Sequence, residues 1–251
     1  MLMPKVGPDA MKEIIDINHT HQAHDDLFKV GRTAIALAKE SRLPSYPESR
    51  RHENDAEHSF HLALSVVELA STYHEQLPEM DMALITQYAL VHDLVEIITH
   101  DVPTFDISQE DYAKKEELEK QALKELVPQL SPHIGEMLLK YERQEDLESR
   151  FVRLVDKMMP VVIHMQKGSE SILKTHPGIG TEEQLYAKIS EKAERLQQAY
   201  PEFPFIHKVF KLINVTSSKH VFKEERQPIS IDKARNRKMM GKMTVEKTVA
   251  L

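Results

Sequence analysis

The fold of this chain is decided by residues 88–106, YALVHDLVEIITHDVPTFD. At their centre, an adjacent His92–Asp93 pair lies inside an apolar run that is typical of a buried helix. Burying an imidazole beside a carboxylate is costly unless a partner satisfies both groups, and a divalent metal binds both. Because His-Asp dipeptides are common in chains that bind nothing, the metal hypothesis needs support from the rest of the sequence.

Two further carboxylates follow the pair within the same segment. Glu96 comes four residues after His92, which places it on the same face of a helix. Asp101 comes just before Val102 and Pro103, where we expect the helix to end. One short segment therefore supplies two candidate metal ligands and two additional acids.

The composition favours a helical chain with one core. The chain has 251 residues, of which 41% are hydrophobic and 29% charged, enough to bury one sizeable core. Only 7 glycines accompany many helix-forming residues, so we expect an all-α fold. The absence of cysteine excludes disulfides, thiolate metal sites and cysteine nucleophiles.

The charge and hydropathy of the chain argue against two classes of partner. A formal net charge of -7 is unlike that of a general nucleic-acid-binding protein. The apolar runs fall short of the roughly 20 residues that cross a bilayer. The N-terminal residues also lack the apolar core of a signal peptide. We therefore expect a cytoplasmic protein with no nucleic-acid or membrane partner.

Apolar periodicity predicts several helices in four parts of the chain. The parts are an N-terminal arm (1–24), a main core (25–170), C-terminal helices (171–218) and a basic tail (219–251). We expect a helix after Asp25 and Asp26, another from about Ala56, and one continuous helix from Pro78 to Val102. The residues expected to face the core include Leu27, Val30, Ile35, Leu37, Ala38, Phe60, Leu62, Leu64, Val67, Leu69, Leu90, Leu118, Ala122, Leu123, Leu126, Phe203, Phe205, Ile206, Val209, Phe210, Leu212 and Ile213.

Further ligand candidates lie outside the opening segment. His58 stands at the start of a helix, and His61 on a neighbouring face is a competing candidate. Asp156 lies among apolar residues, where an acid needs a partner, and Lys157 is the simplest alternative to a metal. The remaining histidine cluster does not share one helical face and is interpreted as surface residues: His19, His21 and His24.

Three ordered segments resemble the HD-domain phosphohydrolase superfamily. They are RRHENDAEHS (50–59), ALVHDLVEIITHDVPT (89–104) and FVRLVDK (151–157), in the order H…HD…D. Within that superfamily, they look most similar to the bacterial 5'-deoxynucleotidases and related HD-domain nucleotidases. The resemblance covers about residues 25–167, and the last third of the chain lies outside it.

The resemblance implies an all-α HD-domain helical bundle around a single metal site. The residues that would ligate one divalent ion (Mn, Co, Mg, Zn, Fe or Ni) are His58, His92, Asp93 and Asp156. Glu96 and Asp101 would act beside the ion, one of them orienting or deprotonating a water and the other protonating the leaving oxygen. Which residue takes which role stays open, and a homodimer is also implied.

The segment before His58 supplies arginines that could bind phosphate. Arg42 is the preferred candidate, with Arg50 and Arg51 as alternatives. The nucleotidases that the chain resembles have an Arg-Trp pair here, whereas this chain has no Trp and its Arg42-Leu43 pair is one residue out of step. The preference between ribose and deoxyribose therefore stays open.

Three functions are compatible with these residues. The first is a 5'-nucleotidase that hydrolyses (deoxy)nucleoside 5'-monophosphates to nucleoside and phosphate. The second is a phosphohydrolase of nucleoside triphosphates or of a signalling nucleotide, which would need more cations at the site. The third is a non-catalytic scaffold that binds a metal or a nucleotide, for which Glu96 and Asp101 would be unnecessary.

Overall fold

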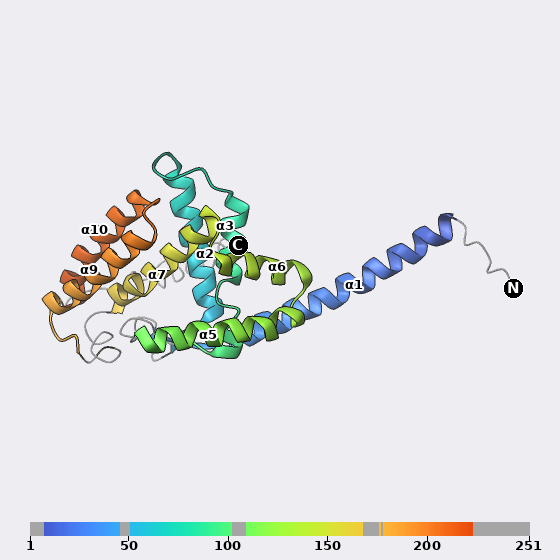
Figure 1. Ribbon diagram of the computed structural model, residues 1–251, viewed down its shortest axis with the longest axis horizontal. Coiled ribbons are helices and arrows are strands. Elements are labelled where there is room, and N and C mark those ends of the chain that lie inside the picture. The colour runs from blue at the N-terminus through green and yellow to red at the C-terminus, as the bar shows by residue number, and fades with distance from the viewer. Residues whose placement is uncertain (1–7, 46–50, 102–108, 168–175, 177, 223–251) are drawn as a thin grey trace, which may run out of the picture.

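The computed structural model describes residues 8–45, 51–101, 109–167, 176 and 178–222, and it is a helical bundle (Figure 1). In chain order its elements are α1 (Pro8–Leu37), β1 (Ser41–Ser45), β2 (His52–Asn54), α2 (Asp55–Thr72), α3 (Met82–Val91), α4 (Glu96–Thr99), α5 (Gln109–Leu126), α6 (Pro132–Arg143), α7 (Leu147–Lys167), α9 (Glu182–Ala199) and α10 (Pro204–Val221). Two short 3-10 helices, His74–Gln76 and Val127–Gln129, complete the described elements. The predicted all-α fold is confirmed.

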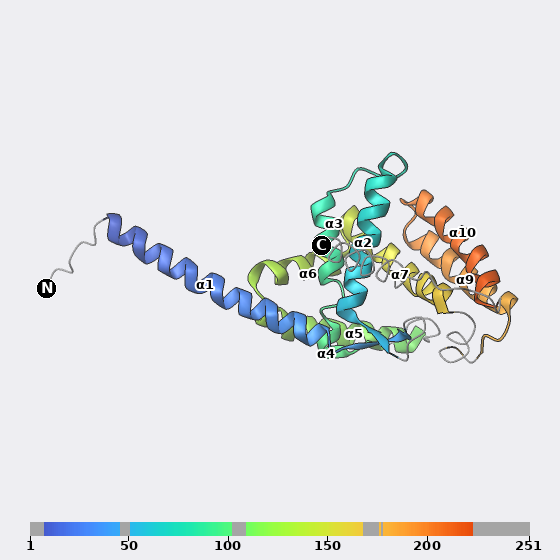
Figure 2. The same ribbon diagram turned by 180° about the vertical axis from the view of Figure 1, so that it is seen from behind.

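The core lies where α2, α3 and α7 pack together. Leu62 on α2, Ile85 and Tyr88 on α3, and Phe151 and Leu154 on α7 are fully buried there. The C-terminal helices α9 and α10 pack on each other, and α10 also packs on α7 (Figure 2). Three helices from distant parts of the sequence therefore surround one centre, which is the arrangement that a shared site requires.

The start of α2 is fixed by its own side chains. Asn54 accepts a hydrogen bond from the Glu57 backbone at 3.0 Å, and Glu57 accepts one from the Asn54 backbone at 3.1 Å. Such a capping box stabilises a helix by about 1 kcal/mol. It also sets the position of His58 in the first turn. The same motif begins α9, with Thr181 as the N-cap.

The continuous helix predicted from Pro78 to Val102 is wrong in two respects. Asp81 caps the helix, so α3 begins at Met82, and the segment breaks into a turn over residues 92–95 before α4. Within the turn the Glu96 N–H donates to the Asp93 carbonyl three residues earlier, at 2.9 Å. The stretch Met82–Thr99 is long and apolar enough to cross a membrane, but half of it is buried inside the bundle.

A two-stranded antiparallel sheet was not predicted. Its register pairs Ser41 with Asn54 and Ser45 with His52. Pairing of this kind joins positions that are distant in the sequence, so local patterns do not reveal it. The sheet places Arg42 beside the first turn of α2.

The first helix is longer and more exposed than expected. It begins at Pro8, so the predicted boundary between residues 24 and 25 falls inside it, and its N-terminal part projects away from the bundle (Figures 1 and 2). Leu27 and Ile35, predicted to face the core, are 71% and 61% exposed, whereas Leu37 is buried. The other residues wrongly predicted to be buried are Val30, Ala38, Phe60, Leu64, Leu90, Leu118 and Leu212.

The exposure of the α2 residues has a geometric reason. Leu62 and Val66 face the core, so positions two residues away from them, Phe60 and Leu64, lie on the opposite side of the helix. At the C-terminal end, α10 continues to Val221, past residue 219 where the basic tail was expected to begin. Residues 223–251 of that tail lie outside the described residues.

Candidate metal centre

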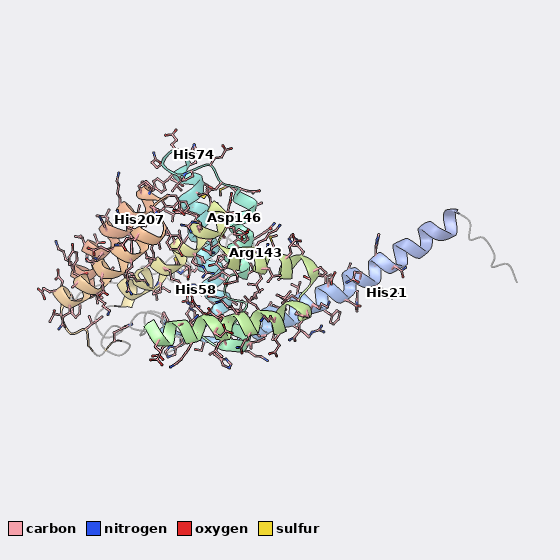
Figure 3. All side chains as sticks on the ribbon, in the orientation of Figure 1. His21, His58, His74, Arg143, Asp146 and His207 are labelled. Carbon is pink, nitrogen blue, oxygen red and sulfur yellow. The ribbon has the colours of Figure 1, made fainter. Side chains whose placement is uncertain are left out.

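Three elements bring the four predicted metal ligands together. His58 comes from the first turn of α2, His92 and Asp93 from the turn after α3, and Asp156 from the middle of α7. Figure 3 places His58 inside the bundle, whereas His21 lies on the projecting part of α1. His58, His92 and Asp156 are buried, and the Asp93 side chain is only 13% exposed. The prediction that these residues converge is confirmed.

Their four ligand atoms form a ring, which we call the metal ring. His92 Nε2 lies 2.9 Å from Asp93 Oδ2, and His58 Nε2 lies 3.0 Å from Asp156 Oδ1. The two cross distances, His58 Nε2 to Asp93 Oδ2 and His92 Nε2 to Asp156 Oδ1, are 3.8 and 3.9 Å. Ligand atoms about 2.1 Å from a common ion are roughly 3 to 4 Å apart, so these four distances are compatible with a divalent ion. The ligand atoms of His58, His92 and Asp93 all lie within 4.8 Å of one another, and Asp156 lies next to both histidines.

The histidines are oriented as metal ligands are. His92 Nδ1 lies 3.0 Å from the Ala89 carbonyl oxygen, to which it donates, and its buried Nε2 faces Asp93 Oδ2. His58 Nδ1 lies 3.7 Å from the buried Glu53 carboxylate. A second group behind each imidazole is typical of metal-bound histidine. The short approach of His92 Nε2 to Asp93 Oδ2, 2.9 Å, is the observation that best supports a metal position between them.

The charges around the ring favour a cation. Burial by itself would lower the pKa of His58, but Asp156 and Glu53 outweigh it and raise that pKa to about 9. Burial would also raise the pKa of Asp93, yet His92 and Arg42 hold it well below its usual range. Burial would likewise raise the pKa of Asp156, but its neighbours, chiefly Lys157, hold that pKa well below its usual range. The ring therefore holds two ionised carboxylates and a proton that a metal can replace.

Asp156 makes both of the contacts that the sequence left as alternatives. Its Oδ1 faces His58 in the ring, and its Oδ2 lies 3.1 Å from Lys157 Nζ. The salt bridge to Lys157 thus coexists with a ligand position and does not replace it. Lys157 leaves only one oxygen of Asp156 directed toward the ring.

A second cluster, which we call the Arg42 cluster, adjoins the ring and shares Asp93 with it. Arg42 Nη1 donates to Asp93 at 2.7 Å, to Asp55 at 3.0 Å and to Glu96 at 3.4 Å. Carboxylate oxygens of Asp55, Asp93 and Glu96 lie within 4.8 Å of one another. The predicted phosphate-binding Arg42 and the predicted catalytic Glu96 are therefore brought to the same place.

Burial and the closeness of the carboxylates in the Arg42 cluster raise the pKa values of Glu96 and Asp55. Burial, together with the charge of Asp93, raises the pKa of Glu96 to about 11, although Arg42 opposes the change. Burial raises the pKa of Asp55 to about 6, again against the influence of Arg42. One guanidinium cannot keep three neighbouring carboxylates ionised. Any further positive charge beside Asp93 would lower the pKa of Glu96 toward its ordinary range.

Asp101 lies at the edge of the same centre. Burial and Asp93 raise the pKa of its carboxyl, while Arg42 and the Leu43 backbone N–H, which donates to it, oppose that rise. The preceding residue, His100, has φ 60° and ψ 160°, a conformation that favours glycine. Such a conformation costs a residue with a side chain about 1–3 kcal/mol.

The described residues among the remaining candidates are not part of the ring. Arg51 donates to Glu57 at 2.7 Å and is 59% exposed at its side chain. Arg50 lies outside the described residues. The ring contains His58 and not the competing His61. The surface histidines were correctly predicted, since all three are exposed: His19, His21 and His24.

Sequence reasoning missed two acids of the site, Glu53 and Asp55. Both are buried, and both lie in the ENDAEH segment that was used only to locate His58. Asp55 precedes His58 by three residues, so it shares a helical face with it, and that spacing was the available signal.

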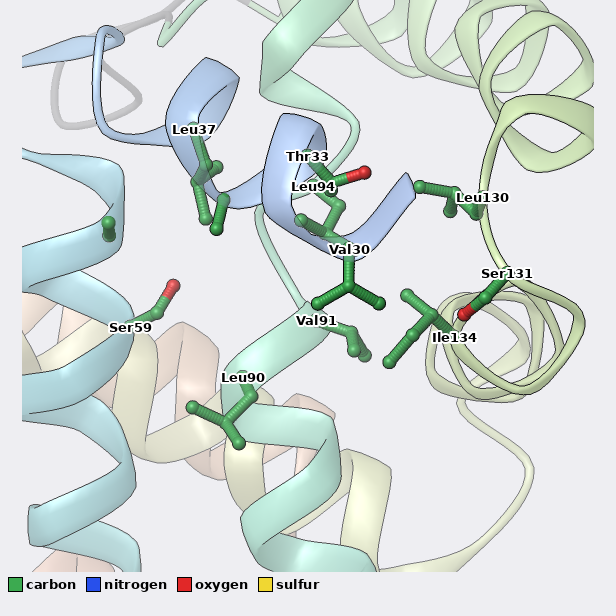
Figure 4. Close-up of a pocket in the computed structure, with 12 residues that line it drawn as sticks. Val30, Thr33, Leu37, Ser59, Leu90, Val91, Leu94, Leu130, Ser131 and Ile134 are labelled. Atoms are coloured by element: carbon green, nitrogen blue, oxygen red, sulfur yellow. The ribbon is translucent and has the colours of Figure 1, made fainter. Parts of the chain in front are cut away.

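An apolar cavity of about 320 Å³ lies between α1, α2, α3 and α6 (Figure 4). Its walls include Leu37, Val91, Leu94 and Ile134, and the hydroxyl of Ser59 points into it. The residues that line it include no carboxylate and no cation. The charged chemistry of the site therefore lies outside this cavity.

Comparisons with known proteins identify the family and the fold. An HD-domain family model matches residues 39–200, which extends through α9 and beyond residue 167, where the resemblance was expected to end. Among curated proteins, none matches the chain.

Solved structures with similar folds come from several organisms. A predicted metal-dependent phosphohydrolase from Magnetospirillum magnetotacticum has a TM-score of 0.58 and 22% identity, covering 80% of this chain and 96% of its own. The PH0347 protein from Pyrococcus horikoshii has a TM-score of 0.51 and 22% identity, covering 74% and 99%. An HD-domain phosphohydrolase from Listeria innocua has a TM-score of 0.50 and 17% identity, covering 78% and 93%. At these identities the likeness concerns the fold.

Proposed function

Because the chain belongs to the HD-domain family, we propose that it is a divalent-metal-dependent phosphohydrolase, and more specifically a 5'-nucleotidase. The substrates would be nucleoside or deoxynucleoside 5'-monophosphates, and the products a nucleoside and phosphate. The observation that carries the proposal is the metal ring beside Glu96, Asp101 and Arg42. A metal site with a purely structural role would not need acids and a cation in this position.

The residues that would hold the ion are those of the metal ring: His58, His92, Asp93 and Asp156. When bound, the ion supplies positive charge for a phosphate oxygen and lowers the pKa of a bound water. Hard and borderline divalent ions suit two imidazoles and two carboxylates, so Mn, Co, Mg, Zn, Fe and Ni are all candidates.

The neighbouring residues have separate roles in the proposal. Arg42 already directs a guanidinium toward Asp93 and Glu96, and it would donate to the substrate phosphate. Burial and the charge of Asp93 raise the pKa of Glu96, and a cation bound beside Asp93 would lower it, so that Glu96 could then accept a proton from water. Asp101, whose pKa is also raised, would donate a proton to the leaving 5' oxygen.

Among the described residues, the pairing of Arg42, Lys157 and Arg51 with carboxylates favours a monophosphate. Arg42 is shared among three carboxylates, and Lys157 is paired with Asp156. Arg51, an alternative phosphate ligand by sequence, pairs with Glu57 at the surface. Three phosphates would need more positive charge than these residues supply, so a triphosphatase is the second choice.

The proposal also includes a cytoplasmic homodimer. Large apolar side chains on α1, α2 and α3 are exposed near the apolar cavity, and a second copy of the chain would cover them. Sedimentation analysis of the full chain should give twice the monomer mass. A monomer at micromolar concentration would contradict this part of the proposal.

Phosphate release from a panel of ribo- and deoxynucleotides, mono- through triphosphate, tests the function. The protein is stripped with a chelator and then reloaded with each candidate metal in turn. We expect nucleoside and phosphate from monophosphates, and none in the chelated sample. Pyrophosphate or triphosphate as the product would refute the monophosphatase, and a metal-loaded protein without any turnover would indicate a non-catalytic scaffold.

A further inference from the structure

Two short segments, 40–43 and 96–101, are joined by three contacts at the edge of the metal centre. The contacts are Glu40 with His100, Arg42 with Glu96, and the Leu43 backbone N–H with Asp101. Two of these contacts involve residues with proposed roles in the reaction. In the third contact, Glu40 Oε2 lies 2.7 Å from His100 Nδ1, and neither residue has a proposed role in the reaction. We call this contact the Glu40–His100 clamp.

The clamp is not explained by stability. The His100 side chain is 75% exposed, so it contributes little packing, and an ion pair with so exposed a member stabilises weakly. His100 nevertheless holds φ 60°, which glycine would adopt at far lower cost. A strained residue next to a proposed catalytic acid is a reason to look for a role in positioning.

Glu40 connects the clamp to the rest of the centre. Its backbone carbonyl accepts a hydrogen bond from the Asp55 N–H at 3.2 Å, at the start of α2. Its side chain reaches His100, whose own N–H donates to the Glu96 carbonyl at 2.8 Å. Glu40 therefore contacts both the first turn of α2 and the residue that follows α4.

We propose that Glu40 and His100 are positioning residues, which hold Asp101 against the Leu43 N–H and hold Arg42 in its cluster. With His100 clamped at positive φ, the chain turns directly after α4, so that Asp101 returns to the centre. The inference rests on the proposed function, because Asp101 and Arg42 are its acid and its phosphate-binding residue.

His100→Gly and Glu40→Gln test the clamp by separating activity from stability. We expect His100→Gly to lower kcat about 10- to 100-fold, since small displacements of catalytic groups have effects of this size. Its Tm should stay unchanged or rise because the strain is removed, and its Mn²⁺ affinity should not change. Glu40→Gln should lower kcat as well. The double variant should lose no more than His100→Gly alone, because the two residues act as a unit.

Gln144→Gly is the matched control. Gln144 is the other non-glycine residue with positive φ in the described part of the chain, at 54°, and it ends α6. Its replacement should leave kcat unchanged. A similar loss in both glycine variants would mean that glycine itself, and not the clamp, lowers the rate.

Hydrogen exchange at the Leu43 amide provides a readout that needs no substrate. If His100 holds Asp101 in place, His100→Gly should accelerate this exchange about tenfold through local opening. Wild-type kcat and wild-type Leu43 protection in His100→Gly would overturn the clamp. If the wild-type chain hydrolyses no nucleotide, the proposed function fails, and the Leu43 exchange rate still decides whether the clamp exists.

Discussion

The metal ring and the Arg42 cluster share Asp93, yet they balance their charges in different ways. The ring combines two imidazoles with two carboxylates and places His92 Nε2 2.9 Å from Asp93 Oδ2. The Arg42 cluster combines three carboxylates with a guanidinium that contacts all of them. The Arg42 cluster thus contains a permanent cation, whereas the ring contains a proton that a metal can replace. This difference is the reason why we propose the ion in the ring and the phosphate on the Arg42 side.

Asp93→Asn should have the largest effect because Asp93 belongs to both halves. We expect loss of the bound metal and at least about a 1,000-fold loss of kcat/KM, since a ligand and a partner of Arg42 disappear together. Metal content by mass spectrometry and phosphate release measure the two effects. Full metal content in this variant would show that Asp93 serves only the Arg42 cluster.

Glu96→Gln separates the two halves. Glu96 lies in the Arg42 cluster and outside the ring, so the variant should keep its metal and lose about 10²- to 10⁴-fold in kcat, the usual contribution of a general base. Loss of the metal in Glu96→Gln would place this carboxylate among the ligands and erase the distinction between the halves.

Arg42→Lys tests the phosphate side of the comparison. A lysine cannot reproduce the guanidinium contacts, so KM should rise about 10- to 100-fold while metal affinity is preserved. Arg51→Lys is the matched substitution, and because Arg51 pairs with Glu57 at the surface, its KM should change less than twofold. Equal effects at the two arginines would contradict the assignment of Arg42.

The pH dependence of metal binding should report on the ring. The pKa of His58 is raised to about 9, so the metal-free ring carries a proton below that pH, and the ion must displace it. The apparent affinity for Mn²⁺ should therefore rise with pH, at most about tenfold per unit, and level off near pH 9. By the same linkage, the stability that protonated His58 gives the metal-free fold is complete below about pH 6.5 and is lost as pH rises through 9. A metal affinity that does not change between pH 6 and 9 would show that His58 is already deprotonated.

The ring could be predicted from the sequence, whereas the Arg42 cluster could be predicted only in part. Each ring residue stands in one of the three segments that resemble the HD-domain phosphohydrolases, and it was this resemblance that implied the ligand set. The cluster depends on a strand pairing that joins Arg42 to the start of α2, and on the turn at residues 92–95 that interrupts the expected helix. Both depend on contacts between distant parts of the chain, which local periodicity does not encode.

The exposed apolar residues also show that local patterns do not encode contacts between elements. Leu62 was predicted correctly because it belongs to the buried face of α2. Phe60 and Leu27 were predicted wrongly, since an apolar residue identifies an interior only when a neighbouring element covers it. The sequence separated an arm, residues 1–24, from the core, but it did not indicate that one helix continues from Pro8 to Leu37.

The position of the bound ion tests the central claim most directly. A crystal of the Mn²⁺-loaded chain, measured near the manganese absorption edge, locates the ion by anomalous scattering. We predict a peak about 2.0 to 2.3 Å from the four ring atoms of His58, His92, Asp93 and Asp156, with Arg42 still in its cluster. A peak among Asp55, Asp93 and Glu96 with Arg42 displaced, or no peak in the ring, would contradict the account.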